Sequence, residues 1–245
     1  MGLLRSLGNY LIFLSAMFRN RESFRVYPPL VVNEMMLIGI NSVFIVSVIS
    51  VFIGAVTAVQ TAYNLVSPLV PKYTIGVIVR DMAVLELSTT FTCVVLAGKV
   101  GSNIAGSLGS MRVSEQIDAL EVMGINSISY LVLPKIIAGV LLFPLLVAFS
   151  AFLIFIGGYI GGVLPGLLTE SDYIYGIRFQ FEPFNITFAL IKGFVFGFLI
   201  TSISSFQGYN TRGGSLEVGK SSTEAVTNSC IALLLADYFL AQILL

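Results

Sequence analysis

The chain has 245 residues, of which 56% are hydrophobic and only 11% are charged, and its mean hydropathy is +0.95. A soluble domain cannot bury that share of apolar surface, so the composition indicates a polytopic membrane protein. Thirteen basic and 13 acidic residues balance, which excludes the strongly basic surface typical of nucleic-acid binding. The sequence has no His, and Cys93 and Cys230 both lie in apolar segments, which argues against a metal site or a disulfide.

Residues 3–18 carry apolar side chains near helical spacing and are followed by arginines. This pattern is typical of an amphipathic helix that lies in the membrane interface, with Arg19, Arg21 and Arg25 at the headgroup level. A secretory signal peptide is the competing interpretation, because Arg5 precedes an apolar run of suitable length. It is disfavoured because no small-x-small cleavage site follows and the run ends in charges.

Five apolar segments are long enough to cross a hydrocarbon core of about 30 Å. They cover residues 35–62, 75–97, 130–164, 185–206 and 223–245. The second segment is unusual because it contains three charged residues, Arg80, Asp81 and Glu86. The third is longer than one crossing needs, and Pro134 and Pro144 are candidate positions for a kink. The sequence therefore predicts a single all-α membrane domain over residues 1–245, with one interfacial helix and five transmembrane helices.

The most polar helical pattern, residues 112–124, lies between the second and third segments. Ser114 is a candidate N-cap for a helix over residues 114–123, and Gly124 suits its C-terminal end. Its side chains divide between two faces, with Ile117, Leu120 and Met123 on one and Glu115, Asp118 and Glu121 on the other. A helix of about ten residues is marginal in water, so this one must dock onto something. It is either a loop helix packed on its own protein or a contact surface for a cytoplasmic partner.

Basic residues are distributed unevenly between the two sides of the predicted spans. Nine lie on the side of the N-terminus, namely Arg5, Arg19, Arg21, Arg25, Lys99, Arg112, Lys135, Arg212 and Lys220. Four lie on the opposite side, namely Lys72, Arg80, Arg178 and Lys192. The positive-inside rule therefore places the N-terminus and the 114–123 helix in the cytoplasm, and the C-terminus on the far side.

Residues 214–221 match the phosphate-binding P-loop pattern G-x-x-x-x-G-K-[ST] letter for letter. That pattern binds nucleotide only where a strand leads into it and a helix N-terminus receives the phosphates. Here it lies in a short predicted loop between two spans, which leaves no room for a nucleotide-binding domain. The chain is therefore not expected to hydrolyse ATP itself, and we expect no catalytic residue in it.

Glu86 lies near the middle of the second span, where a carboxylate is costly and usually functional. Arg80 lies six residues away on a different helix face, so it cannot easily neutralise Glu86 from the same helix. Two interpretations remain: a protonated or cross-paired structural acid, or a polar group that lines a substrate cavity. Asp237 is expected to lie closer to the interface and to be solvated.

Three pairs of glycines recur at four-residue spacing: Gly157 and Gly161, Gly158 and Gly162, and Gly193 and Gly197. Such spacing lets helix backbones approach closely in lipid. The contact is either within one chain, which we favour, or between two copies.

Several motifs come in the order and at the distances of one known family. They are Phe52-Ile-Gly54, Leu85-Glu86-Leu87, Leu96-Ala-Gly-Lys-Val-Gly-Ser102, Met111-Arg-Val-Ser-Glu-Gln-Ile-Asp-Ala-Leu-Glu-Val-Met-Gly124, Phe206-Gln-Gly-Tyr209 and Ala236-Asp237. Together they resemble the MlaE/YrbE permease family, the membrane subunit of MCE-type ABC lipid transporters, over nearly the whole chain. The Glu-Gln-Ile-Asp-Ala-Leu stretch with its Met-Gly end is the most specific part.

The resemblance implies an ABC-transporter permease domain with one interfacial helix and five spans. It also implies a homodimer that binds two cytoplasmic ABC ATPase subunits, which hold the ATP and magnesium, and a periplasmic MCE-domain protein. Some such systems add a STAS-domain subunit. The implied task is movement of phospholipid between the inner and outer membranes of a bacterial envelope, with this chain in the inner membrane and without a cofactor of its own.

The resemblance also implies roles for two groups of residues. The 114–123 helix takes the place of the coupling helix that fits a groove on the ATPase, which gives as coupling residues Ser114, Glu115, Gln116, Asp118, Leu120, Glu121 and Met123. The lipid would lie in a cavity between two permease copies, lined in part by Val56, Val59, Gln60 and Glu86. The chain departs from the family in having Leu85 and Leu87-Ser88 around the glutamate, where Arg and Gly-Pro are common, and Lys99 in place of Arg. These departures concern the polar detail of the cavity.

Two other function classes are compatible with the composition. An ion-driven secondary transporter would have paired intramembrane acids and discontinuous helices in repeated halves, but the sequence shows no internal repeat. A membrane scaffold that only anchors partners would need no polar cavity.

Overall fold

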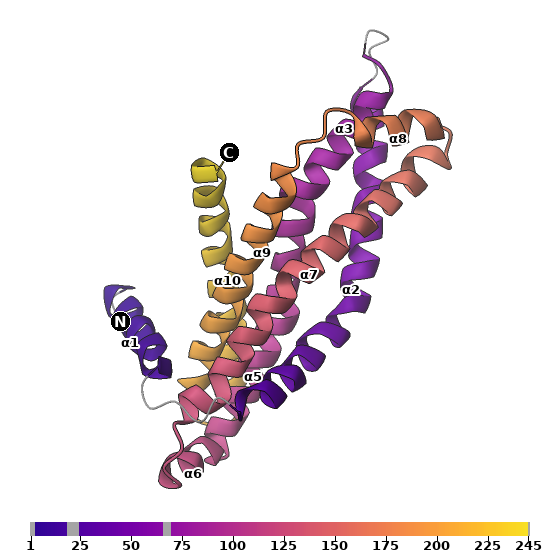
Figure 1. The fold of residues 1–245 in the computed structure, drawn as a ribbon. Coiled ribbons are helices and arrows are strands. Elements are labelled where there is room, and N and C mark those ends of the chain that lie inside the picture. The colour runs from indigo at the N-terminus through magenta and orange to yellow at the C-terminus, as the bar shows by residue number, and fades with distance from the viewer. Residues whose placement is uncertain (1–2, 19–24, 66–69, 245) are drawn as a thin grey trace.

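In the computed structural model the described residues are 3–18, 25–65 and 70–244. They form a long bundle of helices, and this described part of the chain contains no strand (Figure 1). Five helices in it are long and apolar enough to cross a membrane. They are α2 (Tyr27–Asn64), the composite helix Tyr73–Val113, α7 (Ser127–Val163), α9 (Phe184–Tyr209) and α10 (Ser215–Leu244). The prediction of an all-α membrane fold with five spans and a shorter N-terminal helix is confirmed.

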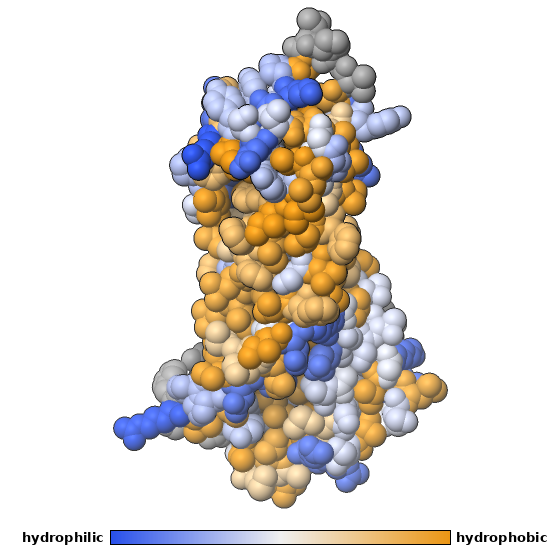
Figure 2. All heavy atoms as spheres, turned by 90° about the vertical axis from the view of Figure 1, so that its right-hand side faces the viewer, coloured by the Kyte–Doolittle hydropathy of each residue, from blue (hydrophilic) through white to orange (hydrophobic). Residues whose placement is uncertain are grey.

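The shorter helices lie at the two ends of the bundle. The short α6 (Gln116–Val122) closes one end, and α1 (Leu3–Phe18) lies beside that end, against α7 and α9 (Figure 1). The opposite end is covered by α8 (Glu170–Arg178), which packs on α3 (Tyr73–Met82). Figure 2 shows a broad hydrophobic band between two more polar regions, as expected of a protein whose middle lies in hydrocarbon. The α6 end and the α8 end therefore face the two aqueous sides.

Three helices extend further than the hydropathy pattern predicts. The first span begins at Tyr27 rather than at residue 35, because Pro28 and Pro29 fit the first turn of a helix, where backbone N–H groups have no acceptor. The second continues to Val113, through residues that the sequence predicts as part of a polar loop. α10 likewise begins at Ser215 rather than at residue 223. The polar turns of α5 (Ser102–Val113) and α10 continue these helices beyond the apolar band because the two helices pack against each other. Hydropathy alone does not detect such packing.

The long third segment is a single helix, and the loop after it is partly helical. α7 runs unbroken through Pro134 and Pro144. Residues 165–184, predicted as a loop, contain α8. Thr169 caps the N-terminus of this helix, since its side chain accepts a hydrogen bond from the backbone N–H of Asp172 at 3.2 Å.

The second span changes its pitch along its length. After α3 it passes through the π-helical segment η1 (Ala83–Phe91), then α4 (Thr92–Leu96), a second π-helical segment η2 (Ala97–Gly101), and α5 (Ser102–Val113). π-Helical turns are rare in proteins. Most of them are single-turn insertions into α-helices, and they are frequent at functional sites. Glu86 lies within η1. The segment that carries the intramembrane carboxylate is therefore also one whose backbone departs from α-helical geometry.

Glycines allow α2 and α7 to approach closely. A Cβ added at Gly157 would lie 2.0 Å from the carbonyl oxygen of Val51, and one at Gly54 would lie 2.1 Å from that of Ile154. Only glycine fits at such backbone contacts. The third glycine pair, on α9, packs against α7 in the same way. The small-residue spacing therefore packs helices within one chain.

Candidate functional site

Three charged side chains from three spans meet inside the bundle. Lys192 of α9 is fully buried, and its Nζ lies 3.1 Å from Oε1 of Glu86 and 2.6 Å from Oδ1 of Asp237 on α10. The same ammonium donates to the backbone carbonyl of Leu85 at 2.9 Å. The ammonium thus has two hydrogen-bond acceptors and, in Asp237, a second ion-pair partner, without which its burial would cost several kcal/mol. Glu86, Lys192 and Asp237 are called the charge triad below.

The charge triad agrees with one interpretation of the sequence and corrects two. Glu86 is cross-paired with another helix, which is one of its two predicted states. Lys192 does not lie on the far side of the membrane, as the count of basic residues assumed, but inside α9. Asp237 is not fully solvated, because only 16% of its side chain is exposed. The sequence did hold a signal for Lys192, since a lysine inside an apolar run rarely lacks an acidic partner on a neighbouring helix.

Glu86 is the outward-facing member of the triad. Its side chain is 51% exposed, and Oε2 accepts a hydrogen bond from the hydroxyl of Thr90 at 3.0 Å. Because Lys192 binds both this carboxylate and the carbonyl of Leu85, it attaches the η1 backbone to α9. One carboxylate oxygen of Glu86 therefore pairs with Lys192 inside the bundle, and the exposed part of the carboxylate faces the outside of this chain.

The other predicted lipid-cavity residues lie on the surface of α2. Val56, Val59 and Gln60 line, together with Ala55, an open hollow of about 220 Å³. Glu86 does not line that hollow, so a single protomer does not bring the four residues into one cavity. A shared cavity needs a second surface, and the assignment of these residues to lipid stays a prediction.

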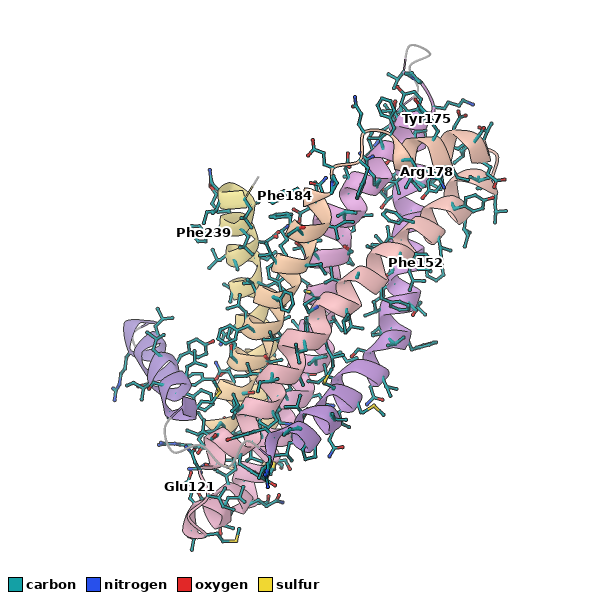
Figure 3. The ribbon with its side chains drawn as sticks, viewed as in Figure 1. Glu121, Phe152, Tyr175, Arg178, Phe184 and Phe239 are labelled. Carbon is teal, nitrogen blue, oxygen red and sulfur yellow. The ribbon has the colours of Figure 1, made fainter. Side chains whose placement is uncertain are left out.

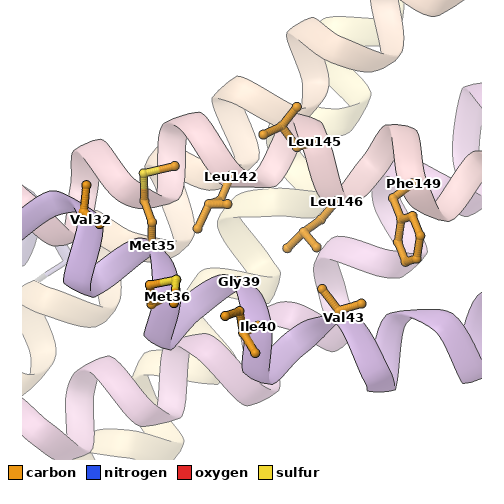
Figure 4. A pocket seen from close by; sticks show the side chains of 10 residues that line it. All are labelled: Val32, Met35, Met36, Gly39, Ile40, Val43, Leu142, Leu145, Leu146 and Phe149. Carbon is orange, nitrogen blue, oxygen red and sulfur yellow. The ribbon is translucent and has the colours of Figure 1, made fainter.

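A larger apolar groove lies between residues 32–43 of α2 and residues 142–149 of α7 (Figure 4). Its volume is about 510 Å³. The ten lining residues are Val32, Met35, Met36, Gly39, Ile40, Val43, Leu142, Leu145, Leu146 and Phe149. None of them has a polar side chain, so the groove has the chemistry of an alkyl-chain contact. The sequence did not predict it, because apolar residues within a span carry no pattern that distinguishes a groove from a packed face.

At the α6 end, the chain reverses through two residues. Ser114 is not the N-cap of α6, as predicted, because it ends α5 and donates its hydroxyl to the carbonyl of Ser110 at 2.8 Å. Glu115 follows in the left-handed region with φ 60°, which turns the chain into α6. Gly124, with φ 80°, ends the turn after α6 as predicted. α6 is thus a two-turn helix between two sharp bends.

Two acidic residues attach α6 to its own chain. Oδ1 of Asp118 lies 2.6 Å from Nη1 of Arg112 on α5. Oε1 of Glu121 accepts hydrogen bonds from the hydroxyls of Ser127 on α7 and Tyr209 on α9, each at 2.9 Å. Figure 3 shows Glu121 at this end of the bundle, opposite Tyr175 and Arg178 of α8. The acidic face predicted to meet a partner is therefore used largely within the chain.

The outward side of α6 is formed by other residues. Val122 is 89% exposed and Met123 66%, whereas Ile117 is fully buried. Met123 does not share the face of Ile117, because a spacing of six residues rotates a side chain by about 240° around a helix. Glu115 and Gln116 are also exposed, and Leu120 is half-buried. Val122 and Met123 are thus two adjacent apolar side chains that are exposed at this aqueous end.

At the opposite end, Arg80 is a structural residue. Its guanidinium is buried and donates to the carbonyls of Ile177, at 3.3 Å, and Phe179 at the C-terminus of α8, where a positive charge is stabilising. It also pairs with Asp81 at 2.8 Å. The guanidinium of Arg80 thus fixes α8 to α3, and Asp81 is its ion-pair partner.

The P-loop match does not form a phosphate-binding loop. Ser215–Ser221 are the first turns of α10, so their backbone follows a helix rather than wrapping around an anion. The described residues also place Glu217 next to Lys220, with 3.7 Å between their charged atoms.

The five spans, the charge triad and the short helix docked at one aqueous end describe a multi-spanning membrane protein. The family model described as "Permease MlaE" matches residues 31–243. The chain therefore belongs to the MlaE permease family.

Proteins similar to this chain occur in several bacteria and in a plant. A "Probable ABC transporter permease protein" of Rickettsia bellii is 34% identical, covering 98% of this chain and 93% of the relative. The "Intermembrane phospholipid transport system permease protein MlaE" of Haemophilus influenzae is 26% identical, covering 98% and 92%. The chloroplastic "Protein TRIGALACTOSYLDIACYLGLYCEROL 1" of Arabidopsis thaliana is 39% identical, covering 64% and 45%. The chain is thus similar to ABC permeases over almost its whole length.

Proposed function

We propose that this chain is the membrane subunit of an ATP-driven transporter that moves phospholipid between the inner and outer membranes of a bacterial envelope. Its family and the H. influenzae relative, whose name specifies intermembrane phospholipid transport, support the cargo. The relatives named as ABC transporter permeases support a separate ATPase subunit, which would hold ATP and magnesium. The chain would lie in the inner membrane as a homodimer, with its α6 end in the cytoplasm and an MCE-domain protein on the periplasmic side.

The observation that carries this proposal is the way α6 is held. It presents Val122 and Met123 outward, while Asp118 and Glu121 attach it to α5, α7 and α9. A partner that moves α6 therefore moves the ends of three spans. Lys192 joins two of those spans again, because it links α9 to the second span within the membrane. Motion at the aqueous end would thus reach Glu86 through packed helices rather than through a flexible loop.

The lipid would contact the apolar surfaces of the first span. Its hollow around Val56, Val59 and Gln60 would become part of a closed cavity when a second copy covers it, and the exposed part of Glu86 would add a polar wall. The alkyl chains would be accommodated by apolar surface such as the α2–α7 groove. This arrangement requires no catalytic residue in the chain.

The test is the double substitution Val122→Asp with Met123→Asp, which places two charges on the outward side of α6. We expect the purified variant to lose its co-purifying ATPase and its ATP-dependent lipid transfer, since apolar contacts at the centre of an interface dominate binding energy. Leu216→Asp is the matched control, because Leu216 is 84% exposed at the same end of the bundle on α10. It should leave both properties intact.

Three results would contradict the proposal. If the double variant retains the ATPase and full transfer, α6 is not the coupling element. If the wild-type chain moves lipid without an ATPase but in response to an ion gradient, the chain is an ion-driven transporter. If it binds partners but never lipid, it is a scaffold.

A further inference from the structure

Tyr209, the last residue of α9, joins five elements of the structure. Its hydroxyl lies 2.9 Å from Oε1 of Glu121 on α6 and 2.8 Å from Oγ of Ser127 on α7. Its ring centroid lies 5.5 Å from that of Phe13 on α1 and 5.7 Å from the guanidinium carbon of Arg112 on α5. Tyr209 is thus in contact with α1, α5, α6 and α7 as well as belonging to α9.

The hydroxyl of Tyr209 is part of a closed ring of three oxygens. Ser127 and Tyr209 both donate to the same carboxylate oxygen of Glu121, and the two hydroxyl oxygens lie 2.8 Å apart. Hydrogen bonds to a charged acceptor are about twice as strong as those between neutral groups. Because one oxygen accepts both hydrogen bonds, a displacement of Glu121 strains its bond to α7 as well as its bond to α9. The ring therefore fixes α6 to the ends of two spans.

The same region holds α1. Phe13 and Met17 are buried, and the ring of Phe13 lies 5.5 Å from those of both Phe206 and Tyr209. The turn that follows α6 adds a second attachment, since Nδ2 of Asn126 donates to the carbonyl of Ala16 at 3.4 Å. α1 therefore rests on the residues that position α6.

We infer that Tyr209 is a positioning residue that joins α6 to α1, so that a displacement of α6 displaces α1 with it. This inference rests on the proposed function, because the displacement is attributed to an ATPase. Away from the bundle, α1 exposes Leu7, Leu11 and Ile12, which are 51%, 64% and 67% exposed. Those side chains suit the membrane interface. α1 is then a second moving part, which transfers the motion of α6 to the lipid layer beside the permease.

The experiment compares two substitutions that each remove one hydroxyl. Tyr209→Phe keeps the ring against Phe13 but loses the bond to Glu121. Tyr10→Phe is the matched control, because the hydroxyl of Tyr10 bonds Oγ of Ser202 at 2.7 Å, which holds α1 to α9 without touching α6. Both variants are assembled with the ATPase in vesicles, and three quantities are measured: ATP hydrolysis, lipid transferred per ATP, and amide exchange of residues 3–18 with and without ATP.

We expect ATP to change amide exchange in α1 of the wild type and of Tyr10→Phe. In Tyr209→Phe this change should be lost from α1 but kept in α6. Lipid transferred per ATP should fall about tenfold, as loss of one hydrogen bond to a charged group implies, while hydrolysis continues. A residue that only stabilises the fold would reduce hydrolysis and transfer together.

A second variant allows the test to be made if Tyr209→Phe does not fold. Glu121→Gln keeps the shape of the side chain and one acceptor oxygen but removes the charge. Lipid transferred per ATP should therefore fall while hydrolysis continues, but by less than in Tyr209→Phe. The inference is overturned, while the proposed function stands, if Tyr209→Phe shows wild-type lipid transfer per ATP and wild-type amide exchange in α1. If Tyr209→Phe does not assemble, the same result in Glu121→Gln overturns it. If the wild-type chain binds no ATPase, both are overturned.

Discussion

Two polar clusters hold the helices together, and they differ mainly in their surroundings. The charge triad lies within the spans around Lys192, whose side chain is 0% exposed. The cluster at the α6 end combines the Arg112–Asp118 pair, with side chains 32% and 51% exposed, and the hydrogen-bonded ring around Glu121. Both join residues that are distant in the sequence. Only the first does so around a side chain that is fully buried.

This difference decides what each cluster can do. Inside hydrocarbon, an unpaired charge is costly, so the triad keeps its partners and fixes one arrangement of three spans. At the aqueous end, water compensates a broken pair, and exposed ion pairs contribute about 0–1 kcal/mol. The α6 cluster can therefore rearrange during a transport cycle, while the triad transmits the movement without coming apart. The substitutions below test that division.

The largest effect is expected from Lys192→Ala, which leaves two carboxylates without their cation. Breaking a buried pair from one side destabilises a protein by about 3–5 kcal/mol, and the exposure of Glu86 places this case near the lower figure. The free energy of unfolding of the purified protein in detergent, measured by chemical denaturation, should fall accordingly. An unchanged unfolding curve would show that the triad does not hold the spans.

The control replaces all three charges at once. Lys192→Met combined with Glu86→Gln and Asp237→Asn should be less destabilised than Lys192→Ala, because an uncharged amide costs much less to bury than an unpaired carboxylate. If the triple variant is as unstable as Lys192→Ala, lost packing rather than unpaired charge is the cause. Lipid transfer by the stable triple variant then reports on Glu86 as a cavity residue separately from its role in folding.

A smaller loss is expected from Glu121→Ala. It removes one acceptor from two hydroxyls, and Ser127 and Tyr209 are left near enough to bond one another, since their oxygens lie 2.8 Å apart. We expect a loss of about 1.5–3 kcal/mol in a fully buried setting, and less here because water reaches Glu121. Hydrogen exchange of residues 116–122 should rise more than that of α9. An equal rise in both helices would place the ring among the bonds that stabilise the whole bundle.

The sequence predicted the number and type of spans because hydropathy is a local property. It did not predict where those helices end, since the polar turns of α5 and α10 are stabilised by contacts with each other, such as that between Gly106 and Ser222. The partner of Glu86 was also missed, because Lys192 is 106 residues away and only the fold brings the two together. Pairing of this kind is tertiary information.

The functional helix was predicted in its place but not in its orientation. The pattern at residues 114–123 correctly indicated a short polar helix, confirmed as α6. The family resemblance assigned residues of both faces to a partner, whereas Asp118 and Glu121 bind this chain. In a helix of two turns, the bends before and after it set which side faces outward, and the left-handed Glu115 that sets the first bend has no sequence signal. The coupling role that the family resemblance implies stays a prediction, and the contacts show which side of α6 is exposed.

The smallest effect is expected from Arg112→Ala, which removes the partner of Asp118. Both side chains are partly exposed, so the pair should contribute about 0–1 kcal/mol to the free energy of unfolding. This contribution of the ion pair should disappear near 1 M salt, where the screening length is about 3 Å. The effect of Lys192→Ala should persist at that salt concentration. Denaturation of both variants at low and high salt makes the measurement. If Arg112→Ala is instead as damaging as Lys192→Ala and equally insensitive to salt, Arg112 acts through its packing on Tyr209, and the two clusters are not separated by their exposure to water.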